Sequence, residues 1–347
     1  MKVAFFVTDL QKEQHQYSTY RLAHCLQQGG HQVFHTAASD MTCRKDGVFV
    51  IKTWRVPEGP CKSPRAYFEK LRNEAIREER EVADLDILML RSDPSLSQEQ
   101  TSWAATMGIE LGRLAREMGV VVLNNPDGLN RALNKMYLQL FPEQVRPRSI
   151  VTMSLDDIEE FAAGLPGDLI LKPVQGSAGK GVFLVSRGKR ENLAQIVQVL
   201  ARDGYIVAQE YLPEAEEGDT RLFLVNGRPL MRNGKYAAFR RLRKGEDVRS
   251  NVHVGGRIAR AEITPAILEV VEVVRPRLVS DGMFFVGLDI VRDKLLEINV
   301  FCPGGLGNAQ RLEGVDFVPE IIRLLERKIQ SSSYYRERWY HLDSTML

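Results

Sequence analysis

Two apolar runs near the C-terminal end of the chain are separated by only three charged residues. The runs cover residues 283–291 and 295–300, and Arg292, Asp293 and Lys294 lie between them. Apolar runs of this length around a short polar turn predict an antiparallel hairpin. Because strands this apolar are rarely exposed to water, the sequence also predicts that the hairpin is buried.

Two acids and one amide of this hairpin are predicted to share a face. If the turn is centred on Asp293, then Asp289 and Glu297 lie opposite each other, and Asn299 points to the same face. Facing carboxylates destabilise a strand pair unless a cation lies between them. Oxygen ligands without His or Cys favour a hard ion that also binds phosphates, which is Mg²⁺. A surface hairpin with scattered acids is the alternative.

Composition gives no global attraction to nucleic acid or membranes. The chain has 347 residues, 44% of them hydrophobic, and a formal net charge of +2, so any basic site must be local. No run approaches the ~18 apolar residues that a membrane span requires, and the first residues predict a strand, not a signal peptide. Four cysteines without paired metal spacing are expected to be reduced thiols of a cytoplasmic protein: Cys25, Cys43, Cys61 and Cys302.

The first third of the chain alternates strands and helices, which predicts a parallel sheet with helices on its faces. Strands are expected at residues 3–7, 32–35, 85–90 and 120–123, and helices at 17–28, 65–82 and 98–118. The charged run 77–81 is interpreted as a solvated face of the second helix. Polar residues after such strands face the usual ligand crevice, and here they are Asp9, Arg91 and Asp93.

From about Arg148 the pattern predicts a compact α+β unit and then a second set of strands. Its expected strands are 149–152, 169–172, 182–185 and 205–209, with helices at 156–163 and 190–203. The dipeptide Asn226-Gly227 predicts a tight turn between strands 220–225 and 229–233. Helices are expected at 265–280 and 317–328, and the residues from 331 are expected to form a peripheral tail.

Lys172 ends an apolar strand, and a loop of small residues, 176–181, follows it. The three glycines of the loop allow backbone N–H groups to approach an anion, and Lys180 adds positive charge. The loop is not a Walker motif, because Gly follows Lys180 and a strand follows where a helix is required. A plain turn is the alternative, but a lysine at the end of a buried strand favours an anion site.

Three further segments carry candidate chemistry. The strand end 209–212 offers backbone and side-chain groups that can bind the amino edge of adenine. Asp219 and Arg221 share one face of a strand, either as functional groups or as a salt-bridged pair. The segment 239–257 clusters six basic residues, which favours a nucleotide polyphosphate over nucleic acid because no aromatic platform accompanies them: Arg240, Arg241, Arg243, Lys244, Arg249 and Arg257.

Together these motifs resemble the ATP-grasp superfamily, most closely the bacterial glutathione synthetases. The order is NKxY around Lys135, ILKP with the glycine loop, QEYL, DTR, RSNxxxGG, GLDI and EIN, and the run at 90–94 is similar to that family's M-R-K-D-P-P. The resemblance implies an α/β protein with the ATP-grasp fold. It implies an N-terminal parallel-sheet (pre-ATP-grasp) domain at 1–122, a central and lid subdomain at 123–213, and a C-terminal antiparallel-sheet catalytic subdomain at 214–330, before the tail at 331–347.

The resemblance also implies a role for each matching residue. ATP phosphates would contact Lys135 and Lys172, under a flap formed by Gly176, Ser177, Gly179, Lys180 and Gly181. Adenine would lie against Gln209, Glu210, Tyr211 and Leu212, and the ribose near Asp219. Two magnesium ions, with manganese as a substitute, would be held by Asp289, Glu297 and Asn299. Arg221 and Arg249 would be catalytic, and substrate would contact Arg91, Asp93, Arg249, Asn251, Gly255, Gly256, Gly304 and Gly305.

The reaction implied is the ATP-dependent joining of γ-glutamylcysteine and glycine through an acyl phosphate, by a cytoplasmic homo-oligomer. The chain departs from the family at residues 300–307, which border the acceptor amine there. Two alternatives stay open: a sister ligase with a different amine or a longer peptide, and a synapsin-type ATP-binding protein without ligase chemistry. Arg221, Arg249 and the metal triad argue against the second. Cys302 is interpreted as a packed thiol, not as a nucleophile.

Overall fold

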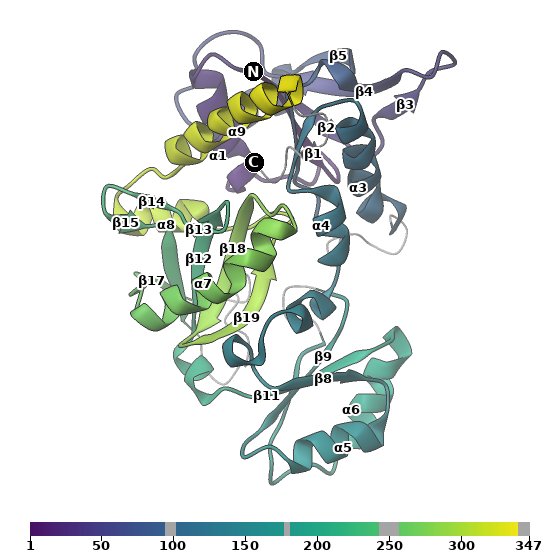
Figure 1. Ribbon diagram of the computed structural model, residues 1–347, viewed down its shortest axis with the longest axis vertical. Coiled ribbons are helices and arrows are strands. Elements are labelled where there is room, and N and C mark those ends of the chain that lie inside the picture. Colours follow the sequence, from purple (N-terminus) through teal and green to yellow (C-terminus); the bar gives the residue numbers. More distant parts are fainter. Residues whose placement is uncertain (94–101, 177–180, 243–256, 339–347) are drawn as a thin grey trace.

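The computed structural model describes residues 1–93, 102–176, 181–242 and 257–338. Figure 1 shows the N-terminal sheet at the top, a second sheet in the middle and a smaller α+β unit at the bottom. Within the described ranges, no helix combines the length and the hydropathy that crossing a membrane requires. The expected organisation, with a parallel-stranded N-terminal sheet and antiparallel sheets after it, is confirmed. The expected domain boundaries stay a prediction.

The N-terminal sheet has a parallel centre, as predicted, with antiparallel strands added at one side. The parallel strands are β1 (Lys2–Val7), β2 (Gln32–Ala37), β6 (Ile87–Leu90) and β7 (Val121–Leu123). The additions are β3 (Met41–Cys43), β4 (Phe49–Arg55) and β5 (Ile76–Glu81). Helices α1 (Ser18–Gln28), α3 (Ser102–Glu117) and α4 (Pro126–Arg131) connect the parallel strands to one another and to the rest of the chain.

The predicted helix at 65–82 is wrong in its second half. Helix α2 (Pro64–Glu74) ends at Ala75, and the charged run forms the edge strand β5, paired along β4. In a strand, alternate side chains face opposite sides. The guanidinium of Arg80 therefore lies over the ring of Phe34, 4.1 Å from its centroid, while Glu79 and Glu81 face Arg44 of the neighbouring hairpin. Such cross-strand ion pairs stabilise an edge strand.

The α+β unit at the bottom of Figure 1, called the lid below, is one antiparallel sheet with two helices. Its strand order is β10 (Phe183–Val185), β9 (Leu169–Pro173), β11 (Ile206–Glu210) and β8 (Ser149–Thr152), and its helices are α5 (Leu155–Ala163) and α6 (Leu193–Leu200). The lid has its own hydrophobic cluster. Among the described residues, the buried members of that cluster all lie between Ile158 and Ala208.

The middle sheet is antiparallel, as expected for the C-terminal subdomain. Its order is β17 (Arg257–Ala259), β16 (Ala238–Leu242), β12 (Asp219–Val225), β18 (Phe285–Val291) and β19 (Lys294–Asn299). Helix α7 (Pro265–Ser280) packs on it, and α8 (Leu306–Glu313) follows the hairpin. The turn at Asn226-Gly227 is confirmed by positive φ angles of 49° and 71°, which Asn and Gly tolerate best.

Two expectations for the second half are corrected. The strand predicted at 229–233 is broken into β13 (Arg228–Pro229) and β14 (Met231–Arg232), which pairs with β15 (Lys235–Tyr236) instead of the sheet. The last helix, α9 (Val318–Arg338), continues past the predicted end at 328. Because Ser332 is buried, the first residues after 330 are packed against the protein and do not form a loose tail.

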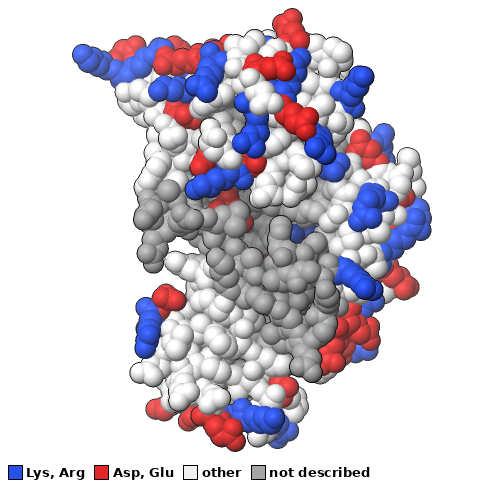
Figure 2. Space-filling view, turned by 180° about the vertical axis from the view of Figure 1, so that it is seen from behind, with Lys and Arg blue, Asp and Glu red and all other residues white. Residues whose placement is uncertain are grey.

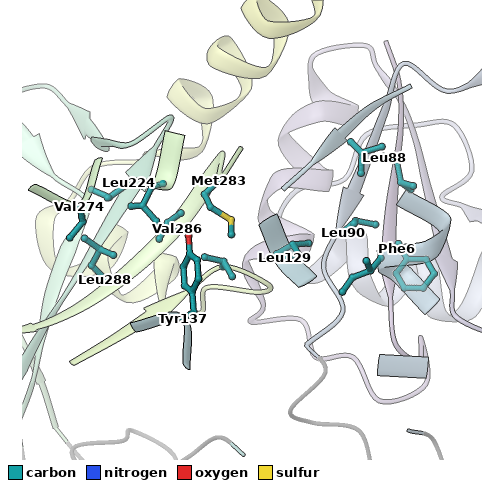
Figure 3. Packing of buried hydrophobic residues seen from close by; sticks show 14 of the residues in the cluster. Phe6, Leu88, Leu90, Leu129, Tyr137, Leu224, Val274, Met283, Val286 and Leu288 are labelled. Atoms are coloured by element: carbon teal, nitrogen blue, oxygen red, sulfur yellow. The ribbon is translucent and has the colours of Figure 1, made fainter. Parts of the chain in front are cut away.

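One hydrophobic cluster joins the N-terminal sheet to the middle sheet. Figure 3 shows Leu88 and Leu90 on one side, Val286 and Leu288 on the other, and Leu129 between the two groups. These side chains belong to one contiguous buried core. The two sheets are therefore held as one body by apolar packing, while the lid packs mainly on itself.

Asn124, directly after β7, joins the same two sheets through hydrogen bonds. Its Oδ1 accepts from the backbone N–H groups of Phe284 (2.8 Å) and Phe285 (2.9 Å). Its Nδ2 donates to the carbonyl oxygens of Phe285 (3.1 Å) and Val300 (2.5 Å). One buried side chain thus satisfies four backbone groups of the middle sheet and its hairpin.

Replacing Asn124 by Ala should therefore lower the free energy of unfolding by about 2 kcal/mol or more, because buried backbone groups lose their partner. Urea unfolding followed by circular dichroism measures the change. Asn192→Ala is the matched control, because Asn192 is exposed and makes no side-chain cap at the start of α6. An Asn124→Ala midpoint equal to that of the control would contradict the proposed link.

Candidate active site

The hairpin of β18 and β19 has the predicted register. Asp289 pairs with Glu297 and Gly287 with Asn299, and every residue of β18 is buried. The amide nitrogen of Asn299 donates to Asp289 Oδ2 at 3.3 Å and to the Gly287 carbonyl at 3.3 Å. The predicted shared face of the two acids and the amide is confirmed, but the pairing needs an irregularity between Asp289 and Ile290, because the turn itself pairs Val291 with Lys294 and Ile290 with Leu295. Burial was predicted for both strands, and it holds for β18 but not for most of β19.

Asp289 lies at the centre of a buried charge network. Arg221 on β12, its register partner on the other side, donates from Nε to Oδ1 (2.7 Å) and from Nη2 to Oδ2 (2.6 Å). Arg241 on β16 also approaches Oδ2, with its Nη2 at 2.6 Å. Burial alone would raise the pKa of Asp289, but the two guanidinium groups outweigh it and hold the pKa at about 2.

Arg241 also binds Asp219, its register partner on β12. Its Nε donates to Asp219 Oδ2 at 2.9 Å, and both side chains are buried. Asp219 and Arg221 therefore do not form the salt-bridged pair that their spacing allowed, since each has a partner on another strand. Burial would lower the pKa of Arg241, but Asp289 and Asp219 raise it further than burial lowers it. We call Arg221, Arg241, Asp219 and Asp289 the acid–arginine network.

Arg241 was predicted only as one of the six basic residues of the segment 239–257, without a place in the site. Its position depends on the antiparallel pairing of β12 with β16, which sets Asp219 opposite Arg241 and Arg221 opposite Phe239. No short-range pattern fixes that register. No strand was predicted at β16. A predicted strand there would have placed Arg241 on the same buried face as Phe239, because alternate residues of a strand share a face.

The donor set suits a hard cation at two of its three expected ligands. The side chain of Glu297 reaches the solvent although protein atoms surround its carboxylate, and Asn299 donates from its amide nitrogen to β18, so its Oδ1 stays available. These protein atoms and then the Asp289 carboxylate raise the pKa of Glu297 further than Arg221, Arg241 and Lys172 lower it. Asp289 fits less well, because Arg221, Arg241 and Asn299 already donate to its oxygens.

Two lysines lie close enough to Glu297 to interact with its charge. Lys135, in the turn 135–140, donates from Nζ to the Gly176 carbonyl (2.7 Å), and its backbone N–H bonds Val174. Lys172 on β9 donates to Gln209 Oε1 at 2.7 Å. Burial and then the charge of Lys135 lower the pKa of Lys172 to about 8, although Glu297 opposes the shift. Glu297 can balance only one of the two lysine charges, so an anionic ligand would balance the other.

The residues expected to hold adenine form the end of β11. Gln209 is buried and faces Lys172, while Glu210 accepts from the backbone N–H of Arg148 at 2.8 Å. The Tyr211 N–H bonds the Asp168 carbonyl, and Leu212 precedes a short helical turn. The expected flap begins at Gly176 and ends at Gly181, whose φ angles of 110° and 68° favour glycine.

Of the expected substrate residues that the structure describes, Arg91 and Gly304 are linked to the loop at 300–307 and to the acid–arginine network. Arg91 is buried and donates from Nη2 to Ser18 Oγ at 2.6 Å, with its guanidinium 5.5 Å from the Phe285 ring centroid. The Gly304 carbonyl accepts from Arg221 Nη1 at 3.3 Å, which links the loop at 300–307 to the network. Gly305 begins α8 with a φ of 91°. Asp93 lies close enough to raise the pKa of Tyr17.

Cys302 lies close enough to Arg91 and Asp93 to interact with their charges. Burial raises the pKa of its thiol, and Thr19 Oγ1 lies 4.0 Å from Sγ. A protonated, packed thiol agrees with the interpretation that Cys302 is not a nucleophile. Several expected site residues lie outside the described residues: Ser177, Gly179, Lys180, Arg249, Asn251, Gly255 and Gly256.

Removing the central charge should destabilise this region. Asp289→Asn leaves two buried arginines with one carboxylate, and we expect a loss of about 3 kcal/mol or more in the free energy of unfolding. Urea unfolding checks this. Asp293→Asn in the exposed turn of the same hairpin is the control and should change the free energy by less than about 0.5 kcal/mol. Equal stability of the two variants would contradict the central role of Asp289.

Comparison with known proteins covers nearly the whole chain. Residues 1–130 match the family described as "Prokaryotic glutathione synthetase, N-terminal domain", and residues 134–314 match its "ATP-grasp domain". A glutathione synthetase of a Synechocystis species is 31% identical over 337 residues, which are 94% of this chain and 100% of that protein. The glutathione synthetase of a Nostoc species is 34% identical over 71% of this chain and 72% of its own length.

Solved structures show the same fold at low sequence identity. D-cycloserine synthetase DcsG aligns with a TM-score of 0.64 at 14% identity, over 94% of this chain and 99% of its own. The ATP-grasp ligase PsnB, complexed with its minimal precursor, aligns with a TM-score of 0.60 at 18% identity, over 94% of this chain and 99% of its own. With both family domains matched and relatives above 30% identity over nearly the full length, the chain belongs to the prokaryotic glutathione synthetase family, whose members are ATP-grasp ligases.

Proposed function

We infer that this protein is an ATP-dependent ligase that joins γ-glutamylcysteine and glycine to form glutathione. The observation that carries the inference is the acid–arginine network beside the Glu297–Asn299 face of the hairpin, with Lys135 and Lys172 across from it. The lysines suit the phosphates of a triphosphate, and the buried arginines suit an anionic reaction intermediate. Family membership supports the same reaction.

On the nucleotide side, Lys135 and Lys172 would neutralise the ATP phosphates, and the end of β11 would hold adenine. Glu297 and Asn299 would hold Mg²⁺, with Asp289 as a third ligand; two ions, and manganese as a substitute, are part of the proposal. The ion, when bound, supplies positive charge that polarises the transferred phosphoryl group. We also propose that Asp219 lies near the ribose and that Gly176 and Gly181 delimit a flap over the phosphates.

On the substrate side, the arginines would stabilise the intermediate. A carboxylate is a poor electrophile, so ATP first phosphorylates the cysteinyl carboxylate and ADP leaves. The amine then forms a C–N bond at the acyl carbon, the C–O bond to phosphate breaks, and phosphate departs with the electron pair. Arg221 suits this step, because Asp289 fixes two of its nitrogens and the third reaches Gly304 of the acceptor loop. Arg241 adds a second fixed charge.

Arg249 would act with Arg221, and Arg91, Asp93, Asn251, Gly255, Gly256 and Gly304 would contact the peptide and the amine. We also propose that the protein works in the cytoplasm as a homo-oligomer on small-molecule substrates. A synapsin-type binder has no use for a buried charge network at the acyl centre, which is why the ligase is favoured.

ADP release tests the proposed function. We expect ADP only when γ-glutamylcysteine and glycine are both present with ATP and Mg²⁺, measured by a coupled assay and by mass spectrometry of glutathione. Glu297→Gln should lower kcat by about a hundredfold, because a charge that holds the ion is lost. Glu159→Gln, an exposed acid on α5, is the control. A protein that binds ATP but releases no ADP under any of these conditions would contradict the ligase proposal.

The pKa of Lys172 gives a second test. When the pH equals this pKa of about 8, half of the free protein molecules carry a neutral Lys172. Phosphates favour the charged form, so ATP affinity should weaken as pH rises from about 7 to 9, with proton uptake on binding near pH 8. Calorimetry in two buffers of different ionisation enthalpy measures both. Lys172→Arg, charged throughout this range, should remove the uptake, and a flat wild-type profile would contradict the assignment.

A further inference from the structure

Asp281 is a buried acid at a position where helix electrostatics disfavours an acid. It directly follows α7 and caps the C-terminal end of that helix, and its side chain is buried. The C-terminal end of a helix carries partial negative charge, so a carboxylate there is unfavourable. Burial adds a further cost unless hydrogen-bonded partners compensate the charge. The partners of this carboxylate must therefore offset both costs.

Three donors from three segments surround the Asp281 carboxylate. Arg277 of α7 donates from Nε to Oδ2 at 2.7 Å, and Arg131 of α4 donates from Nη1 to Oδ1 at 2.9 Å. The hydroxyl of Tyr137, in the turn 135–140, donates to Oδ2 at 2.8 Å. Burial and then the Asp281 carboxylate raise the pKa of Tyr137, so the hydroxyl keeps its proton and stays a donor. The arginines compensate the charge, whereas the tyrosine connects a different segment to it.

Asp281 is fixed in the body that the N-terminal and middle sheets form. A Cβ atom on Gly128 of α4 would collide with the Asp281 carbonyl oxygen, so α4 packs directly on this backbone. The next residue, Gly282, accepts from the backbone N–H of Asn125 at 3.1 Å, and Leu278 of α7 belongs to the core that both sheets share. The carboxylate is thus a fixed point of the body.

The turn 135–140 contacts this body with one residue and the lid with another. It is a 3₁₀ turn, in which side chains two residues apart point in directions roughly 120° apart. Tyr137 is buried in the core of the body, and Figure 3 shows it among the middle-sheet members of that core. The N–H of Lys135 bonds the Val174 carbonyl, directly after the lid strand β9, and its Nζ donates to the Gly176 carbonyl. Tyr137 therefore fixes to the body a turn whose lysine lies against the lid.

We propose that Asp281 is a positioning residue for Lys135: through the Tyr137 hydroxyl it fixes the turn that presents the lysine to the ATP phosphates. The inference rests on the proposed function, which places Lys135 at those phosphates. A lysine side chain is long and flexible, so fixing its backbone lowers the entropy that phosphate binding must remove. Asp281 acts only through the turn and contacts neither nucleotide nor substrate.

Tyr137→Phe tests the link, because it removes the hydroxyl and keeps the ring, which packs edge-on against Phe141 with 5.3 Å between the centroids. We expect the Kd for ATP with Mg²⁺, measured by calorimetry on the full-length protein, to rise by about fivefold, because the lysine is less preorganised. The KM for ATP in the ligase assay should rise by a similar factor, and the KM for glycine should not change. A mere loss of folded protein would lower the apparent kcat and leave both KM values unchanged.

Tyr67→Phe is the matched control. Tyr67 is fully buried in the N-terminal domain, and its hydroxyl forms a 2.9 Å hydrogen bond with His35 Nε2. The control therefore loses a buried hydroxyl of the same kind, and it should lower the free energy of unfolding without changing the Kd for ATP. An equal rise of that Kd in both variants would show that lost stability weakens binding, and would overturn the positioning role.

A double-mutant cycle tests whether the effect passes through the lysine. In a Lys135→Ala background, Tyr137→Phe should have no further effect on the Kd for ATP, because the group that the turn positions is already absent. Asp281→Ala, which removes the acceptor, should raise the Kd at least as much as Tyr137→Phe does. Effects of Tyr137→Phe and Lys135→Ala that simply multiply would overturn the proposal.

The outcomes separate this role of Asp281 from the ligase function. An unchanged Kd for ATP in Tyr137→Phe, with turnover intact, would overturn the positioning role and leave the ligase in place. Wild-type protein that binds ATP and releases no ADP would overturn the ligase, and the Kd values would still decide the role of Asp281. Wild-type protein that does not bind ATP would overturn both.

Discussion

The buried carboxylate of Asp289, shared by two arginines, is the constraint on which the middle sheet depends. Three adjacent strands, β16, β12 and β18, must keep their register for Arg241, Arg221 and Asp289 to meet. Asp219 balances the second arginine, so the network is close to neutral. Charges buried in this way seldom add net stability, because desolvation offsets their attraction. Their value lies in holding two guanidinium groups rigid beside the place where a phosphoryl group would be transferred. On the face of the molecule drawn in Figure 2, lysines and arginines of the described residues lie among acids.

Sequence reasoning succeeded where local pattern determines geometry. The hairpin of β18 and β19 follows from a short turn between two apolar runs, although an irregularity in register next to Asp289 also contributes to its pairing with Glu297. The turn at Asn226-Gly227 follows from the backbone preferences of those two residues. The parallel centre of the N-terminal sheet follows from the alternation of strands with helices. These features need no knowledge of distant residues.

The features that were not predicted from the sequence depend on pairing between residues far apart in the chain. The charged run of β5 has no apolar periodicity, so only its pairing with β4 makes it a strand, and a helix was the natural but wrong prediction. Arg241 was seen as one basic residue among six, because nothing near it in sequence shows that it faces Asp219 and Asp289. The loss of Asp289 as a freely available metal ligand has the same origin: two arginines from two other strands occupy its oxygens.

The lid has a hydrophobic cluster separate from those of the two other sheets, which affects how the substrate range of such a ligase can evolve. The proposed adenine and phosphate residues lie largely in the lid, whereas α1 and α8 line a cavity beside the acid–arginine network and belong to a different hydrophobic cluster. Substitutions that remodel one unit leave the apolar contacts of the other untouched. If the nucleotide binds in the lid as proposed, evolution can alter the residues around the cavity at α1 and α8 without repacking the nucleotide site.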